Sequence, residues 1–230
     1  MKYQWILFDA DETLFHFDAF SGLKRMFSQF DIDFTHQDYQ DYRAINEPLW
    51  VEYAAGQITA THLQHTRMRP WADKLDMSPK SLNSAFLQSM AEICALLPGA
   101  QALLDALSGK VNMGIITNGF TELQTIRLER VGLKELFSPL IISDEVGMAK
   151  PDANIFEHAF SLMDNPPKEQ ILMVGDNPHT DILGGLNAGI DTCWLNVAGA
   201  EKPLGIEPHY QVSSLAELQR LLLTTDSEAL

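Results

Sequence analysis

Polar side chains able to do chemistry occur just after four short apolar runs of this 230-residue sequence. In chain order they are Asp9 and Asp11, Thr117 and Asn118, Lys150, and Asp176 and Asp181. Clustered carboxylates repel one another at neutral pH, so a site built from them is costly unless a cation lies among them. The residue types therefore indicate a metal site with a lysine and a hydroxyl beside it.

The donor types also indicate which cation and which anion this site would take. Oxygen ligands without a neighbouring His or Cys favour Mg²⁺ over zinc or a softer metal. Lys150 supplies a point charge suited to a phosphate. Thr117 and the Asn118-Gly119 backbone can donate hydrogen bonds to phosphoryl oxygens, and the following helix N-terminus adds its positive end. Phosphoryl transfer depends on positioning and charge neutralisation, so these residues predict that chemistry.

Short apolar runs predict the strands that would position these side chains. They are Gln4–Phe8, Val111–Ile116, Leu140–Ser143, Gln170–Val174 and Thr192–Leu195, with a weaker signal at His209–Val212. The helical patterns between them are Ala100–Leu107, Thr121–Val131, Asn154–Met163 and Asp181–Ala188. Runs apolar on both faces are typical of a parallel sheet covered by helices, so we expect a Rossmann-like, doubly wound α/β domain. Ligands of such sheets gather at the carboxyl ends of the strands, where the polar residues occur.

One long stretch interrupts the alternation of strands and helices. It contains four helical patterns and no convincing strand signal: Ala19–Phe30, Gln37–Ala55, Ala60–Leu75 and Ser78–Leu96. A crossover between parallel strands needs only about a dozen residues or somewhat more, so this stretch is too long for one. We predict a core of residues 1–15 and 98–230, with an inserted all-helical subdomain of residues 16–97.

These motifs resemble, in order, the four motifs of the haloacid dehalogenase (HAD) superfamily. The matching residues are Asp9-x-Asp11-x-Thr13, Thr117-Asn118-Gly119, Lys150-Pro151 and Gly175-Asp176-x-x-x-x-Asp181. Short acidic strings are common in proteins, but four motifs at successive predicted strand ends form a specific pattern. The resemblance covers nearly the whole chain, because a helical insert after the first motif resembles the C1 cap of this superfamily.

The resemblance implies a covalent mechanism. Asp9 would attack phosphorus and form an aspartyl phosphate. Asp11 would donate a proton to the leaving alcohol and then take one from the hydrolytic water. Lys150 would neutralise the charge of the nucleophile and the phosphoryl group, which Thr117 and Asn118 would hold.

The resemblance also implies the ligands of a divalent cation. Mg²⁺, or Mn²⁺ or another divalent cation in its place, would be held by the Asp9 carboxylate, the Asp11 backbone carbonyl and Asp176. Asp181 would lie nearby and support either the metal site or Lys150.

Asp11 distinguishes branches within the superfamily. True haloacid dehalogenases resemble this chain in their aspartate nucleophile but lack the second aspartate, and related ion-pumping ATPases have Thr there. Asp11 thus points to phosphatases and phosphomutases. The whole-chain resemblance to house-cleaning nucleotidases implies a phosphoric monoester hydrolase for nucleoside 5′-monophosphates, pyrimidine and deoxy ones preferred. Two alternatives stay open: a sugar-phosphate phosphatase or phosphomutase of the superfamily, and a non-catalytic binding or regulatory protein on its fold.

The net charge of the sequence argues against some classes of binding partner. Lys and Arg number 16 against 31 Asp and Glu, a net charge of −15. Polymeric nucleic acids and anionic membranes require a basic surface, so we expect neither and favour a small phosphate ester.

Cys94 and Cys193 form no disulfide framework, and the N-terminus has no signal-peptide pattern, so we expect a cytoplasmic protein. The sequence does not predict an oligomeric state.

Other suggestive residues have structural interpretations. His62 and His65 lack a third ligand for a metal site. Gly184, Gly185 and Gly189 fit no phosphate-loop spacing, so close helix–sheet packing is the better interpretation. By default, Arg43, Arg67 and Arg69 are expected at the surface. The aromatic residues of the insert are expected mostly in its core, with one or two available to stack on a base: Phe17, Phe20, Tyr39, Tyr42, Trp50, Tyr53 and Trp71.

Overall fold

The computed structural model describes residues 1–224, which form two compact units. The first unit comprises residues 1–16, 95–118 and 135–224. The second unit comprises residues 17–94 and also residues 119–134. The domain boundaries expected from the sequence stay a prediction, and residues 225–230 of the expected core lie outside the described part.

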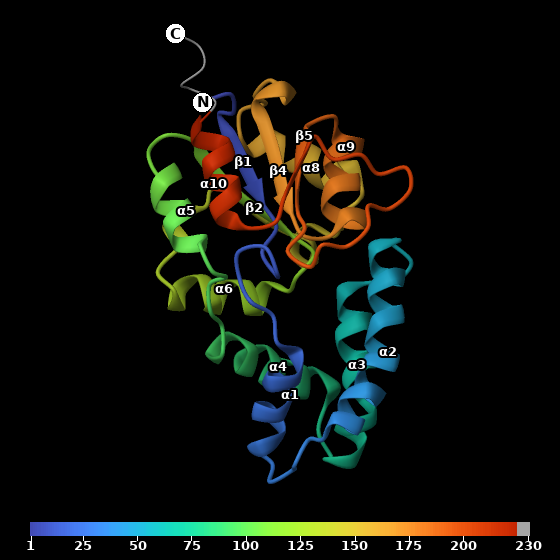
Figure 1. The fold of residues 1–230 in the computed structure, drawn as a ribbon. Helices are drawn as coiled ribbons and strands as arrows, with labels where there is room; N and C mark the ends of the chain where they lie inside the picture. Colours follow the sequence, from blue (N-terminus) through green and yellow to red (C-terminus); the bar gives the residue numbers. More distant parts are fainter. Residues whose placement is uncertain (225–230) are drawn as a thin grey trace. The chain divides into compact units, whose positions relative to one another are not determined.

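A six-stranded parallel sheet forms the centre of the first unit, with the strand order β3-β2-β1-β4-β5-β6 (Figure 1). The strands are β1 (Trp5–Phe8), β2 (Asn112–Thr117), β3 (Leu140–Ile142), β4 (Ile171–Gly175), β5 (Asp191–Leu195) and β6 (Tyr210–Val212). All six predicted strands are confirmed, and so is the Rossmann-like α/β fold class. The central strands form here because their side chains are apolar on both faces, as in Ile6, Leu7 and Phe8, which are fully buried.

Helices cover both faces of this sheet (Figure 1). One face carries α5 (Ala100–Leu107) and α10 (Leu215–Thr224), which pack against each other. The other face carries α8 (Ala153–Leu162) and α9 (Leu183–Ala188). Phe156 and Phe160 of α8 pack with Leu7 and Met173 of the strands in one apolar core. This core packs α8 against the central strands.

The helix predicted over Asp181–Ala188 begins earlier than expected. A π-helical turn, Pro178–Ile182, follows β4 and runs directly into α9. Asn177 is the N-cap, because its side-chain oxygen accepts a hydrogen bond from the His179 amide at 2.9 Å, and Pro178 occupies the first helical position. Asp181 therefore lies inside the turn rather than at its start. A short helix, α7 (Ser143–Val146), likewise follows β3 directly.

The chain leaves and re-enters the first unit as a short antiparallel pair. The His16 amide donates to the Ala95 carbonyl and the Leu97 amide to the Leu14 carbonyl, each at 2.9 Å. Phe15 and Leu96 form a bridge between these bonds. The helix predicted over Ser78–Leu96 accordingly ends earlier, because its last residues pair as extended chain.

The second unit consists of five helices. They are α1 (Ala19–Ser28), α2 (His36–Ala54), α3 (Ala60–Lys74), α4 (Pro79–Glu92) and α6 (Thr121–Arg130). All four helices predicted within residues 16–97 are present with shifted ends, and α6 packs against α4. Tyr42, Tyr53 and Trp71 are buried as expected. Phe17, Phe20, Tyr39 and Trp50 are only partly buried.

Arg67 differs from the expected surface position. Its side chain is 2% exposed, and two guanidinium nitrogens donate to the Asn83 carboxamide oxygen at 2.9 and 2.7 Å. The same guanidinium lies over the rings of Phe86 and Phe120, which explains how a charged group is accommodated in the interior.

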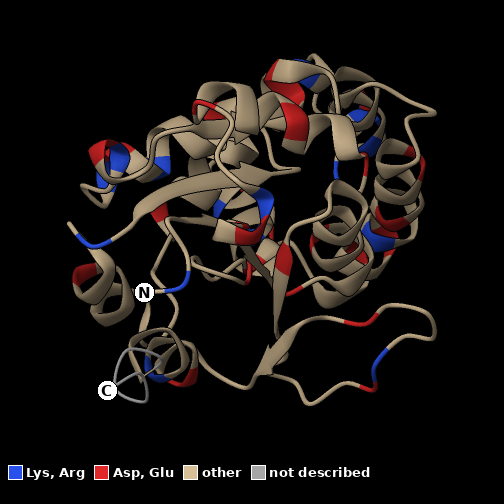
Figure 2. Cartoon of the chain, turned by 90° about the horizontal axis from the view of Figure 1, so that it is seen from above, with Lys and Arg blue, Asp and Glu red and all other residues tan. Residues whose placement is uncertain are grey.

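Basic residues are dispersed along the chain (Figure 2). Several of them form ion pairs with acidic residues. Examples are Arg43 with Glu47, Lys134 with Glu129 and Lys168 with Glu157. Among residues 1–224, no helix combines the length and the apolar character needed to cross a membrane.

Candidate functional site

The sheet register brings the polar residues that follow β1, β2 and β4 to one edge. Phe8, the last residue of β1, pairs with Ile115 of β2 on one side and Val174 of β4 on the other. The next residue, Asp9, donates its amide to the Val174 carbonyl at 2.8 Å. Strands that end side by side therefore deliver their following residues to a common place, as the sequence predicts.

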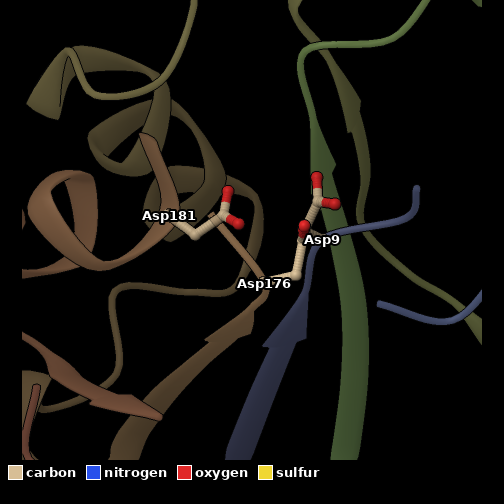
Figure 3. Close-up of side chains that lie close together, drawn as sticks. All are labelled: Asp9, Asp176 and Asp181. Atoms are coloured by element: carbon tan, nitrogen blue, oxygen red, sulfur yellow. The ribbon is translucent and has the colours of Figure 1, made fainter. Parts of the chain in front are cut away.

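Three carboxylates converge at this edge (Figure 3). Asp9, Asp176 and Asp181 each offer an oxygen within 4.8 Å of the others. Asp9 and Asp181 are buried, and Asp176 is partly exposed. Burying three acids together is unfavourable unless positive charge lies near them.

Lys150 supplies one such charge. Its ammonium group contacts Asp9 Oδ1 at 2.6 Å and Asp181 Oδ1 at 2.7 Å, and donates to the Ile116 carbonyl at 2.6 Å. The side chain is 1% exposed, so these contacts are shielded from water. All three ammonium protons have an acceptor.

The pKa values record how the charges balance. Burial raises the pKa of Asp9 to about 7, against the lowering effect of Lys150. Burial, together with the charges of Asp181 and Asp9, raises the pKa of Asp176 to about 8. Burial alone would lower the pKa of Lys150, but the two neighbouring carboxylates raise it above its ordinary value. One lysine thus does not fully compensate the carboxylates.

The donor set fits a hard divalent cation. The converging ligands are carboxylate oxygens, which Mg²⁺ and Ca²⁺ prefer, and the group contains neither His nor Cys. The raised pKa values of Asp9 and Asp176 are what an additional positive charge would reverse. The residues present therefore fit the divalent ion that the sequence predicts.

Asp181 is held more tightly within the protein than the other two acids. Oδ2 accepts the Asn177 amide at 3.0 Å, and Oδ1 accepts the Thr180 hydroxyl at 3.2 Å besides Lys150. Gly175 makes this approach possible, since a Cβ atom there would lie 2.2 Å from Asp181 Oδ2. Both oxygens of Asp181 are thus engaged, which favours support of Lys150 over direct metal coordination.

Asp11 and Thr117 lie at the same edge of the sheet. Asp11 is partly exposed in the turn after β1, where the Leu14 and Phe15 amides both donate to the Ala10 carbonyl. Its charge contributes to the raised pKa of Asp9, so the two carboxylates are near each other. Thr117 is the last residue of β2 and is 1% exposed.

Asn118, whose expected contact with a phosphoryl group stays a prediction, uses its side chain within the protein. Its Oδ1 accepts the Lys150 amide at 2.8 Å, and its Nδ2 donates to the Lys150 carbonyl at 2.9 Å. The carboxamide is therefore bound to the backbone of the lysine.

Two supporting residues received no role from the sequence. The buried Thr13 accepts the Asp176 amide at 3.1 Å, and the Trp194 indole donates to the Asp176 carbonyl at 2.8 Å. Thr13 is the last residue of the Asp-x-Asp-x-Thr motif, so the sequence offers a signal for it. Trp194 has no such signal, because its sequence context indicates only an apolar strand. Together they position the loop that carries Asp176.

The glycines after β4 have the packing role that the sequence indicated. A Cβ at Gly184 would lie 2.7 Å from Phe156, and one at Gly185 would lie 2.6 Å from Thr192. Gly189 instead ends α9 at a φ of 75°, a conformation that favours glycine.

Comparison with known proteins gives consistent matches over most of the chain. The family model of haloacid dehalogenase-like hydrolases matches residues 3–189. Pyrimidine 5′-nucleotidase YjjG of Escherichia coli (strain K12) is 55% identical over 222 residues, covering 96% of this chain and 99% of that protein. Pyrimidine 5′-nucleotidase PynA of Streptococcus pneumoniae (strain ATCC BAA-255 / R6) is 33% identical over 224 residues, covering 95% and 94%.

A solved structure shows the same fold. The crystal structure of the putative HAD-hydrolase YfnB from Bacillus subtilis, bound to magnesium, matches with a TM-score of 0.82 and 28% sequence identity. The match covers 97% of this chain and 100% of that one.

Proposed function

Because the chain belongs to the haloacid dehalogenase-like hydrolase family, as its four motifs predict, we propose that it hydrolyses nucleoside 5′-monophosphates at the Asp9 edge of the sheet. Pyrimidine nucleotides, deoxy ones included, are the preferred substrates. The names of two similar proteins, both pyrimidine 5′-nucleotidases, support this substrate class.

One observation carries the proposal most directly. The Asp9 carboxylate lies buried against the Lys150 ammonium at 2.6 Å, beside Asp176 and Asp181. A buried carboxylate with a lysine contact has the low exposure to water that a nucleophile toward phosphorus needs, and its neighbours can bind the charge of a phosphate. A purely structural role does not require four charged groups at one strand edge, which speaks against a non-catalytic protein.

In the first step, an Asp9 carboxylate oxygen forms a bond to phosphorus while the bond from phosphorus to the nucleoside 5′ oxygen breaks. The leaving oxygen takes a proton from Asp11. In the second step, a water molecule gives a proton to Asp11, and the oxygen of this water attacks the phosphorus of the aspartyl phosphate. The bond from phosphorus to Asp9 breaks, inorganic phosphate leaves, and Asp9 is again a carboxylate.

The remaining residues bind and orient. Lys150 holds Asp9 in place and offsets the negative charge of the phosphoryl group, and the Thr117 hydroxyl donates to that group. Asp181 supports Lys150 by its 2.7 Å contact. Asp9, Asp176 and the Asp11 carbonyl would hold a divalent cation, Mg²⁺ in the first instance. When bound, this ion neutralises phosphoryl charge and lowers the pKa of the nearby carboxylates.

A substrate panel tests the proposal. Phosphate release from pyrimidine and purine nucleoside monophosphates, sugar phosphates and phosphoserine is measured with Mg²⁺ and again with EDTA. We expect Mg²⁺-dependent release, greatest with pyrimidine nucleotides. Sugar phosphates far ahead of nucleotides would refute the substrate class, and isomerisation of a sugar phosphate that depends on a bisphosphate would indicate a mutase.

Two variants test the assigned roles. Asp9→Asn should abolish turnover, and Asp11→Asn should slow it by about 10²–10⁴-fold while Mg²⁺ binding persists. Asp73→Asn changes an exposed carboxylate in α3 and serves as the matched control with unchanged turnover. Retained activity in Asp9→Asn would refute the nucleophile assignment.

A further inference from the structure

The Asn118 carboxamide binds the backbone of Lys150 at two points. The Lys150 amide donates to Asn118 Oδ1 at 2.8 Å, and Asn118 Nδ2 donates to the Lys150 carbonyl at 2.9 Å. This pairing imitates the exchange of two bonds between neighbouring strands. A carboxamide engaged in this way can turn toward a phosphoryl group only by breaking both bonds.

Lys150 has no regular secondary structure of its own to hold it. It lies in a turn between α7 and α8, so its backbone takes part in neither a helix nor a strand. Its ammonium donates to the Ile116 carbonyl at 2.6 Å. Residues 116–118 at the end of β2 therefore hold the lysine at both ends, the backbone through Asn118 and the ammonium through Ile116.

Thr117 lies between these two points of attachment and is 1% exposed. The three hydrogen bonds, two through Asn118 and one through the Ile116 carbonyl, thus fix the position of Lys150 relative to Thr117. A small displacement of the Lys150 backbone would be carried along the side chain to the ammonium and would change its 2.6 Å contact with Asp9.

We propose that Asn118 is a positioning residue for phosphoryl transfer, which fixes the Lys150 backbone so that the ammonium group contacts Asp9. Asn118 acts through Lys150, and its side chain is not a ligand of the phosphoryl group. The catalytic part of this inference rests on the proposed function, whereas the positioning part concerns this chain alone.

Asn118→Ala removes both bonds, and Asn187→Ala is the matched control. The Asn187 carboxamide donates to the carbonyl of the next residue, Pro151, at 3.1 Å, so its loss removes one bond from the same turn without touching Lys150. Crystal structures of both variants and of the wild type give the distance from Lys150 Nζ to Asp9 Oδ1. Steady-state hydrolysis of a pyrimidine nucleoside monophosphate gives kcat and KM.

In Asn118→Ala we expect this distance to lengthen and kcat to fall by about 10- to 100-fold, with KM changed less than about threefold, because the lost bonds orient a charge acting in the transition state. Asn187→Ala should match the wild type in the distance from Lys150 Nζ to Asp9 Oδ1 and in kcat. If Asn118→Ala does not fold, Asn118→Asp keeps the acceptor for the Lys150 amide and should show a smaller shift in the same direction.

An unmoved Lys150 would overturn the inference, whether or not kcat falls. A rise in KM with unchanged kcat would also overturn it, since that result indicates direct substrate binding by Asn118. Absence of hydrolysis by the wild type would refute the proposed function, while the displacement of Lys150 would still be decided by the structures.

Discussion

The buried Asp9 carboxylate predicts that Asp9→Asn, although inactive, makes the metal-free fold more stable. Burial raises the pKa of Asp9 to about 7, and the charges of Asp181 and Asp11 add to this, while Lys150 opposes it. In an unfolded chain an aspartate titrates near 3.9. The folded protein therefore binds more protons than the unfolded chain between about pH 4 and pH 7, and the free energy of unfolding falls as pH rises through that window.

The size of the effect follows from the pKa difference. About three units at about 1.36 kcal/mol each give about 4 kcal/mol of destabilisation above pH 7. Asparagine has no carboxyl proton to lose and keeps an oxygen that accepts from Lys150. Coupling among the three acids reduces the gain, so we expect Asp9→Asn to be more stable than the wild type by about 2–4 kcal/mol near pH 8 in EDTA. The two proteins should be equally stable near pH 4.

Urea unfolding followed by circular dichroism at several pH values measures this difference. Asp73→Asn, which changes an exposed carboxylate, should follow the wild type at every pH. Added Mg²⁺ should raise the stability of the wild type near neutral pH and that of Asp9→Asn much less. Equal or lower stability of Asp9→Asn near pH 8 in EDTA would refute the reasoning about buried charge.

Three further substitutions test other parts of the site. Lys150→Met leaves buried carboxylates without their cation, so we expect a loss of about 3–5 kcal/mol in urea unfolding and no measurable phosphate release; unchanged stability would contradict the charge balance. Gly175→Ala places a Cβ 2.2 Å from Asp181 Oδ2, so we expect the free energy of unfolding to fall by about 1–3 kcal/mol and kcat to fall as well. A crystal structure of this variant with Asp181 undisturbed would contradict this expectation. Trp194→Phe loses the bond to the Asp176 carbonyl; we expect about 1 kcal/mol lower stability and weaker Mg²⁺ binding by calorimetry, and unaltered binding would show that the indole does not position Asp176.

The strands and the residues that follow them could be predicted because both depend on local sequence. A strand such as Ile6-Leu7-Phe8 is apolar on both faces, and both faces are buried only in a sheet that helices cover on each side. Asp9 and Asp176 then follow adjacent strands, and the carboxyl ends of parallel strands meet. The family predicted from these motifs is confirmed by the match over residues 3–189.

The contacts of Asn118 and Arg67 could not be predicted, because they depend on partners far away in sequence. Asn118 binds a residue 32 positions later, and its residue type is equally compatible with a phosphate. Arg67 is buried because Asn83 and two aromatic rings surround it, none of which its own segment reveals. The extent of the second unit was hidden for the same reason, since α6 follows β2 in sequence but packs against α4.

The antiparallel pairing of residues 14–16 with 95–97 has a consequence for how this enzyme family can diversify. The two ends of the intervening segment are hydrogen-bonded to each other, so this pairing does not depend on the length of the chain between them. Lengthening a closed loop is inexpensive, about 0.6 kcal/mol for each doubling. The intervening segment can therefore change in length at a small cost in closing this pair, provided that the replacement still packs against α6.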